Sequence, residues 1–148
     1  MIERILVPLD GSTLAERALQ PAVELAQKFG AKVTLLCAIG AEEAVFASMG
    51  SDQYPAPPPA SQRLDWVRSQ AYLRNIETAW PCKSVPTEIR VDVGGAPEVI
   101  VQTAEQIGAD LIVMSTHGRS GLSRFLYGSV AEAVLRGTQR PLLLIPVK

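Results

Sequence analysis

The sequence predicts an α/β fold, in which a mostly parallel sheet carries helices on both faces. Five short apolar runs alternate with longer stretches of helical periodicity, and this alternation is typical of such folds. Four of the five runs are continuously apolar, which is the habit of strands covered on both faces. A length of 148 residues is the usual size of one domain, so we expect a single domain over residues 1–148.

The expected strands are 4–9, 32–39, 86–93, 110–115 and 141–147. The third run alternates Ile89, Val91 and Val93 with charged residues, so we expect it at an edge of the sheet. The first run is interrupted only by Pro8 and is expected near the centre. Parallel sheets bind ligands beyond the carboxyl ends of their strands, where the strand order reverses. The loop DGST at 10–13, which follows the first strand, should therefore belong to a binding site.

The first expected helix covers residues 13–29, where apolar side chains recur every three or four positions. Thr13 and Glu16 have the spacing of a capping box, and Gly30 suits the left-handed residue that often follows a helix. Pro21 is awkward inside this helix and should kink it or disturb its middle turn.

Further helices are expected at 61–79, 97–108 and 129–137. Pro97 suits the first position of its helix. Ser129 is expected to be the N-cap of the last helix, in a capping box with Glu132, and Gly137 should end that helix. Residues 40–60 fit no such element. They combine a short helical possibility at 41–49 with a proline-rich loop, which we interpret as a surface excursion rather than a PxxP ligand.

The overall composition excludes several classes of protein. Apolar residues make up 47% of the chain and charged residues 20%, which is typical of globular proteins. A formal net charge of −1 gives no reason to expect nucleic-acid binding, and no apolar run approaches the roughly 20 residues that span a bilayer. The N-terminus does not resemble a signal peptide, and Cys37 and Cys82 are too few for a disulfide framework or a zinc site. We expect a cytoplasmic protein with reduced thiols.

A second candidate loop lies at 115–129, with the sequence STHGRSGLSRFLYGS. It leads from the fourth strand to the start of the last helix, where backbone N–H groups and the helix dipole attract anions. Gly128 would let an anion approach the backbone, and Gly118 could form a turn with positive φ. Arg119 and Arg124 could contact phosphate oxygens. These features also suit a flexible lid or an ordinary glycine-rich turn, so the residues alone leave three interpretations open.

Three stretches of the chain resemble the universal stress protein family: VPLDGS at 7–12, DLIVMSTHGRSGLSRFLYGSVAEAVL at 110–135, and RPLLLIPV at 140–147. The nucleotide-binding branch of that family carries the pattern G-x2-G-x9-G-[ST]. Gly118, Gly128 and Ser129 match its last three positions with the correct spacing, whereas Ser115 stands where the pattern has its first glycine. Walker A and GxGxxG patterns are absent.

The resemblance implies a Rossmann-like fold, similar to that of the adenine nucleotide alpha hydrolases, with the strand order 3-2-1-4-5. It also implies ATP as the ligand, either alone or together with Mg²⁺. Pro8 and Asp10 would then line the adenine and ribose end, and Ala38 and Met114 would flank the base. The phosphates and the ribose would be held by Ser115, Gly118, Gly128, Ser129 and Val130. On this basis, Gly128→Ala should weaken nucleotide binding and leave the fold nearly intact.

The expected function is that of a dimeric, ATP-binding module in a stress response, acting through an unidentified protein partner. The last strand, Pro141 to Val147, would be an exposed apolar edge, and pairing with its copy would form a two-fold homodimer, as the resemblance also implies. No catalytic residue is assigned, because His117 has no obvious partner and no lysine clamp or carboxylate cluster lies beside the loop. Slow ATP hydrolysis or phosphotransfer, and action through the dimer surface without nucleotide, stay as alternatives.

Overall fold

The structure is a computed structural model that describes residues 1–40, 60–117 and 128–147. Its strands are β1 (Arg4–Pro8), β2 (Lys32–Ile39), β3 (Thr87–Val93), β4 (Leu111–His117) and β5 (Leu142–Val147). Its α-helices are α1 (Leu19–Phe29), α3 (Ala60–Thr78), α4 (Ala96–Ile107) and α5 (Ser129–Gly137). Two short 3-10 helices, Ala15–Ala18 and Cys82–Ser84, complete the described elements.

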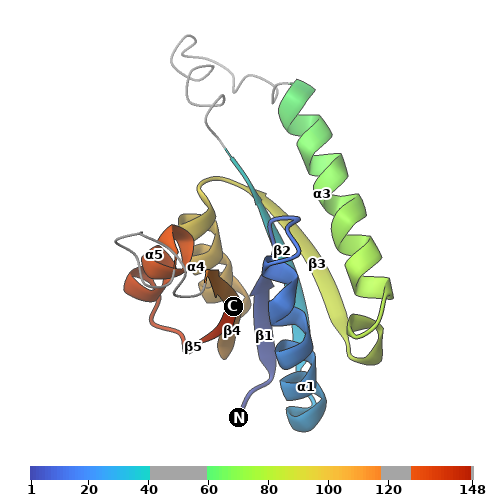
Figure 1. Ribbon diagram of the computed structural model, residues 1–148, viewed down its shortest axis with the longest axis vertical. Coiled ribbons are helices and arrows are strands. Elements are labelled where there is room, and N and C mark those ends of the chain that lie inside the picture. The colour runs from blue at the N-terminus through green and yellow to red at the C-terminus, as the bar shows by residue number, and fades with distance from the viewer. Residues whose placement is uncertain (41–59, 118–127, 148) are drawn as a thin grey trace.

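The five strands form one parallel sheet in the order β3-β2-β1-β4-β5 (Figure 1). The predicted fold class and strand order are therefore confirmed, with β1 at the centre and β3 at an edge. The strand order reverses at β1, because the chain pairs β2 on one side of β1 and returns later to pair β4 on the other side. This reversal is the point at which parallel sheets bind ligands.

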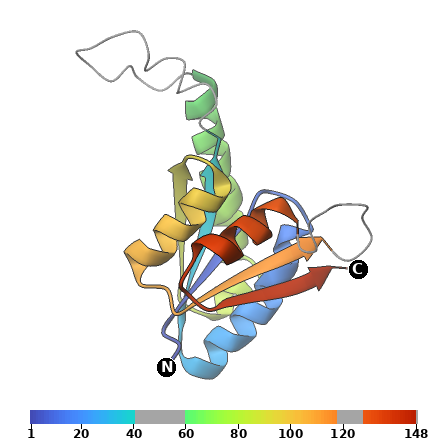
Figure 2. The same cartoon turned by 90° about the vertical axis from the view of Figure 1, so that its left-hand side faces the viewer.

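The helices form a layer on each face of the sheet. Helices α1 and α3 cover one face over Ile5, Val7, Leu35 and Val113, and Leu73 of α3 is completely buried there. Helices α4 and α5 cover the other face, where they bury a second cluster around residues such as Leu6, Leu36 and Ile112 (Figure 2). Both faces of the central strands are thus buried, which explains why their sequences are continuously apolar. None of the described helices is both long and apolar enough to cross a membrane.

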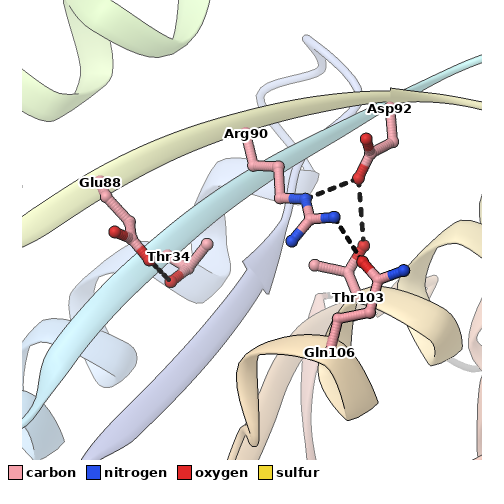
Figure 3. A network of polar contacts seen from close by, with 6 residues as sticks. All are labelled: Thr34, Glu88, Arg90, Asp92, Thr103 and Gln106. Atoms are coloured by element: carbon pink, nitrogen blue, oxygen red, sulfur yellow. Dashed lines mark hydrogen bonds and ion pairs between the residues drawn. The ribbon is translucent and has the colours of Figure 1, made fainter.

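The edge strand β3 is polar on the face that α4 covers only in part. Arg90 pairs with Asp92 at 2.7 Å and donates to Gln106 of α4, and Thr103 of α4 donates to Asp92 at 3.4 Å (Figure 3). Glu88 accepts a hydrogen bond from Thr34 of β2 at 3.0 Å and forms an ion pair with Lys32. The Lys32 ammonium group lowers the pKa of Glu88. These contacts explain why this strand alternates in sequence.

The predicted helix at 13–29 is wrong in its first turns. The chain forms a 3-10 helix at Ala15–Ala18, and α1 begins only at Leu19. Pro21 therefore lies in the first turn of α1, where its missing N–H costs no helical hydrogen bond, and it does not kink a middle turn. The predicted stop is confirmed, because Gly30 is left-handed, with φ 70° and ψ 31°.

The predicted helix starts near Pro97 and Ser129 are each shifted by one residue. Ala96 is the first residue of α4, so Pro97 is the second. Ser129 is the first residue of α5, and the N-cap is Gly128, so the predicted capping box of Ser129 and Glu132 is wrong. Glu132 instead forms an ion pair with Arg136 one turn later, at 3.2 Å. The predicted short helix at 41–49 and the proline-rich loop as far as residue 59 lie outside the described residues, and Ala60 is the first residue of α3.

Candidate functional site

A pocket lies at the carboxyl ends of β1, β2 and β4, where the strand order reverses. Its volume of about 170 Å³ far exceeds the roughly 10–15 Å³ that one water molecule needs, so it has room for part of an organic ligand. All eight candidate site residues that the structure describes line it: Pro8, Asp10, Ala38, Met114, Ser115, Gly128, Ser129 and Val130. The structure thus brings together residues from four separate elements. Whether they bind a nucleotide stays a prediction.

Asp10 begins the loop that follows β1, at one side of the pocket. Its Oδ1 accepts hydrogen bonds from the backbone N–H of Ser12 at 2.9 Å and from the Ser12 hydroxyl at 2.5 Å. The Ser12 hydroxyl in turn accepts a hydrogen bond from the backbone N–H of Ala15 at 3.1 Å. The N-cap position of the 3-10 helix is Leu14, so the predicted capping box of Thr13 and Glu16 is wrong. The Ser12 hydroxyl instead accepts the hydrogen bond of the first N–H of this helix, and Asp10 orients that hydroxyl.

Ser115 lies on β4 and contacts the 3-10 helix directly. Its hydroxyl donates a hydrogen bond to the carbonyl oxygen of Ala15 at 3.3 Å. Ala15 and Leu14 also line the pocket, so the 3-10 helix forms part of its wall. Ser115 thus lines the pocket, while its hydroxyl group is hydrogen-bonded to the backbone of Ala15.

Gly128 brings the start of α5 to the pocket. Its φ of 88° and ψ of 153° lie in a region that only glycine adopts without strain. The Gly128 carbonyl accepts the first hydrogen bond of the helix, from the backbone N–H of Glu132 at 3.0 Å. The N–H groups of the three residues before Glu132 have no acceptor within the helix, and these residues line the pocket. The predicted tolerance of Gly128→Ala is therefore at odds with the backbone, because alanine would be strained there.

The rest of the pocket wall is mostly apolar. Sequence reasoning missed seven of the lining residues: Leu9, Leu14, Ala15, Leu36, Ala96, Ile100 and Ala131. Ala96 and Ile100 come from the first turns of α4, which follows β3. Their spacing of four residues places them on one helix face, and this was the signal available in the sequence. Asp10 is the only charged residue among the described lining residues.

The start of α4 differs from that of α5 in its electrostatics. Glu98 lies in the first turn of α4, and a Cβ built on the N-cap Gly95 would collide with the Glu98 carboxylate. A negative charge therefore already stands at the positive end of this helix dipole. In α5 the N-cap Gly128 has no side chain. Glu132 lies in the first turn of α5, but its carboxylate pairs with Arg136 at 3.2 Å, whereas the carboxylate of Glu98 lies against the N-cap of α4.

Two titratable side chains lie behind the pocket on the α1 and α3 face. Burial and, to a smaller extent, the negative charge of Asp10 raise the pKa of the Cys37 thiol to about 11. Tyr72 of α3 donates a hydrogen bond to Glu16 at 2.6 Å; burial and this hydrogen bond raise the pKa of Tyr72 above its usual range. Both groups are therefore neutral near pH 7 and offer no nucleophile to the pocket.

The other residues predicted for the site are not among the described residues that line the pocket. Gly118, Arg119 and Arg124 lie outside the described residues, and His117 is the last residue of β4. Among the residues that the structure describes, no group of three or more His, Cys, Asp or Glu side chains could hold a metal ion.

The fold and the pocket define a Rossmann-like α/β protein with a ligand pocket at the reversal point of its sheet. Residues 1–146 match the universal stress protein family, and the chain belongs to that family. It is 32% identical over 149 residues to universal stress protein MJ0531 of Methanocaldococcus jannaschii, covering 98% of this chain and 82% of that protein.

Solved structures show the same fold. The structure of MJ0577, described as a hypothetical protein, superposes with a TM-score of 0.79 and 27% identity, covering all of this chain and 98% of the other. A universal stress protein in complex with cAMP superposes with a TM-score of 0.71 and 22% identity, covering 97% of each chain. At this identity the second likeness shows the fold alone.

Proposed function

We propose that the pocket binds an adenine nucleotide, with ATP as the principal ligand, and that the protein acts as a nucleotide-dependent regulatory module in a stress response. One observation carries this proposal. An apolar pocket at the reversal point of the sheet is bordered by an uncapped helix start at Gly128 and by the carboxylate of Asp10. Such a pocket suits a flat base, a sugar with hydroxyl donors and an anionic phosphate chain in one molecule.

The electrostatics favour one orientation of that ligand. The start of α5 offers backbone N–H groups and a positive dipole end to phosphates, whereas Glu98 would repel them from the start of α4. The base would then lie toward Ala38, Ala96 and the apolar Ile100, and Asp10 would accept hydrogen bonds from the sugar. The cAMP complex of another family member indicates that this fold can take an adenine nucleotide.

The test is direct. The purified protein is denatured and the released small molecules are assayed for adenine nucleotides, and ATP binding by the emptied protein is then measured by calorimetry, with and without Mg²⁺. We expect bound or bindable ATP. No detectable binding at millimolar ATP with magnesium would overturn the proposal. Time-resolved phosphate release addresses the alternatives of slow ATP hydrolysis and phosphotransfer.

We also propose that the protein forms a two-fold homodimer through β5. Both sheet edges are open in the described chain, but they differ in charge. β3 presents Glu88, Arg90 and Asp92, whereas β5 (Leu142–Val147) contains no charged residue. Charged side chains protect an edge against pairing, and an apolar edge invites it. Light scattering should give twice the chain mass; a monomeric wild type would contradict this proposal.

A further inference from the structure

Three hydrogen bonds, linked through the backbone of Ala15, join the two sides of the pocket. The Ser115 hydroxyl of β4 donates to the carbonyl oxygen of Ala15 at 3.3 Å. The backbone N–H of Ala15 donates to the Ser12 hydroxyl at 3.1 Å, and that hydroxyl donates to Oδ1 of Asp10 at 2.5 Å. The carbonyl and the N–H of Ala15 belong to neighbouring peptide groups, so the link between Ser115 and Asp10 passes through the backbone of Ala15.

The alternation of β4 explains why Ser115 makes this contact. Leu111 and Val113 of β4 pack into the core on the α1 and α3 face, and Ile112 and Met114 pack into the core on the opposite face. Successive side chains of a strand alternate, so Ser115 points to the same face as Val113, toward the 3-10 helix Ala15–Ala18. The residue is partly buried, and the bond connects positions that are 100 residues apart in the sequence.

This contact depends on the departure from the family pattern. The glycine that the pattern has in place of Ser115 has no hydroxyl and could not bond to Ala15. We propose that Ser115 is a positioning residue, whose hydroxyl fixes the spacing between the Asp10 loop on one side of the pocket and β4 with the start of α5 on the other. The ligand part of this inference rests on the proposed function.

The distance between the Asp10 loop and the start of α5 matters only to a ligand that contacts both of these half-sites. ATP would reach Asp10 with its sugar and the start of α5 with its phosphates. Adenosine would reach only the first half, and inorganic tripolyphosphate only the second. Loss of the Ser115 hydroxyl should therefore weaken ATP binding and leave the two half-ligands unaffected, a selectivity that general destabilisation of the fold does not produce.

The experiment compares Ser115→Ala with the wild type. Calorimetry or NMR titration gives the Kd for ATP, adenosine and tripolyphosphate. We expect the ATP Kd to rise about threefold to tenfold, the range that one neutral hydrogen bond supports, while the other two stay within about twofold. Ser115→Thr, which keeps the hydroxyl, should restore ATP binding. An unchanged ATP Kd, or an equal loss for all three ligands, would overturn the positioning role.

A matched control and a ligand-free measurement complete the design. Ser84→Ala removes a hydroxyl that also donates to a backbone carbonyl, that of Pro81 at 2.7 Å, outside the pocket lining, and should not alter any Kd. In the ligand-free protein, the amides of Ala15–Ala18 should exchange hydrogen faster in Ser115→Ala than in wild type. If the wild type binds no ATP, the proposed function fails and the exchange rates alone decide; unchanged exchange then overturns the link.

Discussion

Substitution of Gly128 by alanine should damage both stability and ligand binding. The φ of 88° and ψ of 153° at this position belong to a region that costs other residues about 1–3 kcal/mol. The backbone cannot relax freely, because the Gly128 carbonyl accepts the first hydrogen bond of α5 from the Glu132 N–H. For a domain of this size, the cost corresponds to a fall in Tm of about 2–12 °C. Displacing one charge-assisted hydrogen bond to a phosphate should raise the ATP Kd about tenfold to hundredfold.

Gly30 provides the control for this substitution. It is also a helix cap with positive φ, at 70°, and the space around it is open to a Cβ. It follows the last turn of α1 and does not line the pocket. Gly30→Ala should therefore cost about 1–2 kcal/mol without changing the ATP Kd.

Asparagine separates the two glycines further. It tolerates the left-handed conformation of Gly30 but not the ψ of 153° at Gly128, so Gly30→Asn should recover stability and Gly128→Asn should not. Thermal unfolding and calorimetry measure both effects. A Gly128→Ala protein with wild-type Tm would refute the backbone argument, and one with wild-type affinity would refute the phosphate position.

The remaining predictions concern single side chains. Cys37 and Cys82, whose pKa values burial raises to about 11, should resist iodoacetamide at pH 8 until the protein is unfolded in urea. Asp110 accepts two backbone N–H bonds that lower its pKa, so Asp110→Asn should lower the unfolding free energy above about pH 4, with the difference from wild type vanishing as the carboxyl protonates at lower pH. Leu73→Ala should cost about 2–5 kcal/mol in urea unfolding, because the Leu73 side chain of α3 is fully buried in the core. Asp10→Asn should keep the Ser12 turn and hence the Tm, while calorimetry shows a weaker ATP affinity.

The sheet could be predicted from the sequence because burial leaves a direct signal. Strands β1, β2, β4 and β5 are apolar without alternation, and β3 alternates because Glu88, Arg90 and Asp92 pair with polar groups on one face. The end of α1 was predictable for a similar reason, since only glycine suits the left-handed backbone at residue 30. In each case the residue types within one short segment are enough to predict the feature.

The helix starts were harder, because several nearby residues compete for each cap. Ser12, Thr13 and Ser129 are all good N-cap residues by composition, and only the path of the chain selects among them. The 3-10 helix has Leu14 at its N-cap, and Ser12 bonds to its first N–H because Asp10 holds the Ser12 hydroxyl. Gly128 displaces Ser129 because the chain enters α5 at positive φ. The spacing of residues in the sequence predicts neither the hydrogen bond between Ser12 and Asp10 nor the positive φ of Gly128.

The sequence predicts the position of the pocket and about half of its lining residues, but not the other residues of its apolar wall. The candidate residues follow strands or start a helix, so the reversal rule brings them to one edge of the sheet. Ile100 and Leu14 line the same pocket through the packing of α4 and the 3-10 helix, which depends on contacts between distant segments. Such contacts leave only a general apolar periodicity in the sequence.

Asp10 shows that capping and ligand binding need not be competing roles. Both hydrogen bonds from Ser12 end on Oδ1, so the turn fixes the carboxylate in place at the edge of the pocket. A carboxylate held in this way loses little conformational freedom when a ligand donates to it, which makes binding more favourable. The same turn presents Ala15 to Ser115, so the residues that stabilise the local fold also set the width of the pocket. In this protein the turn from Asp10 to Ser12, which leads into the 3-10 helix, is therefore part of the proposed binding site.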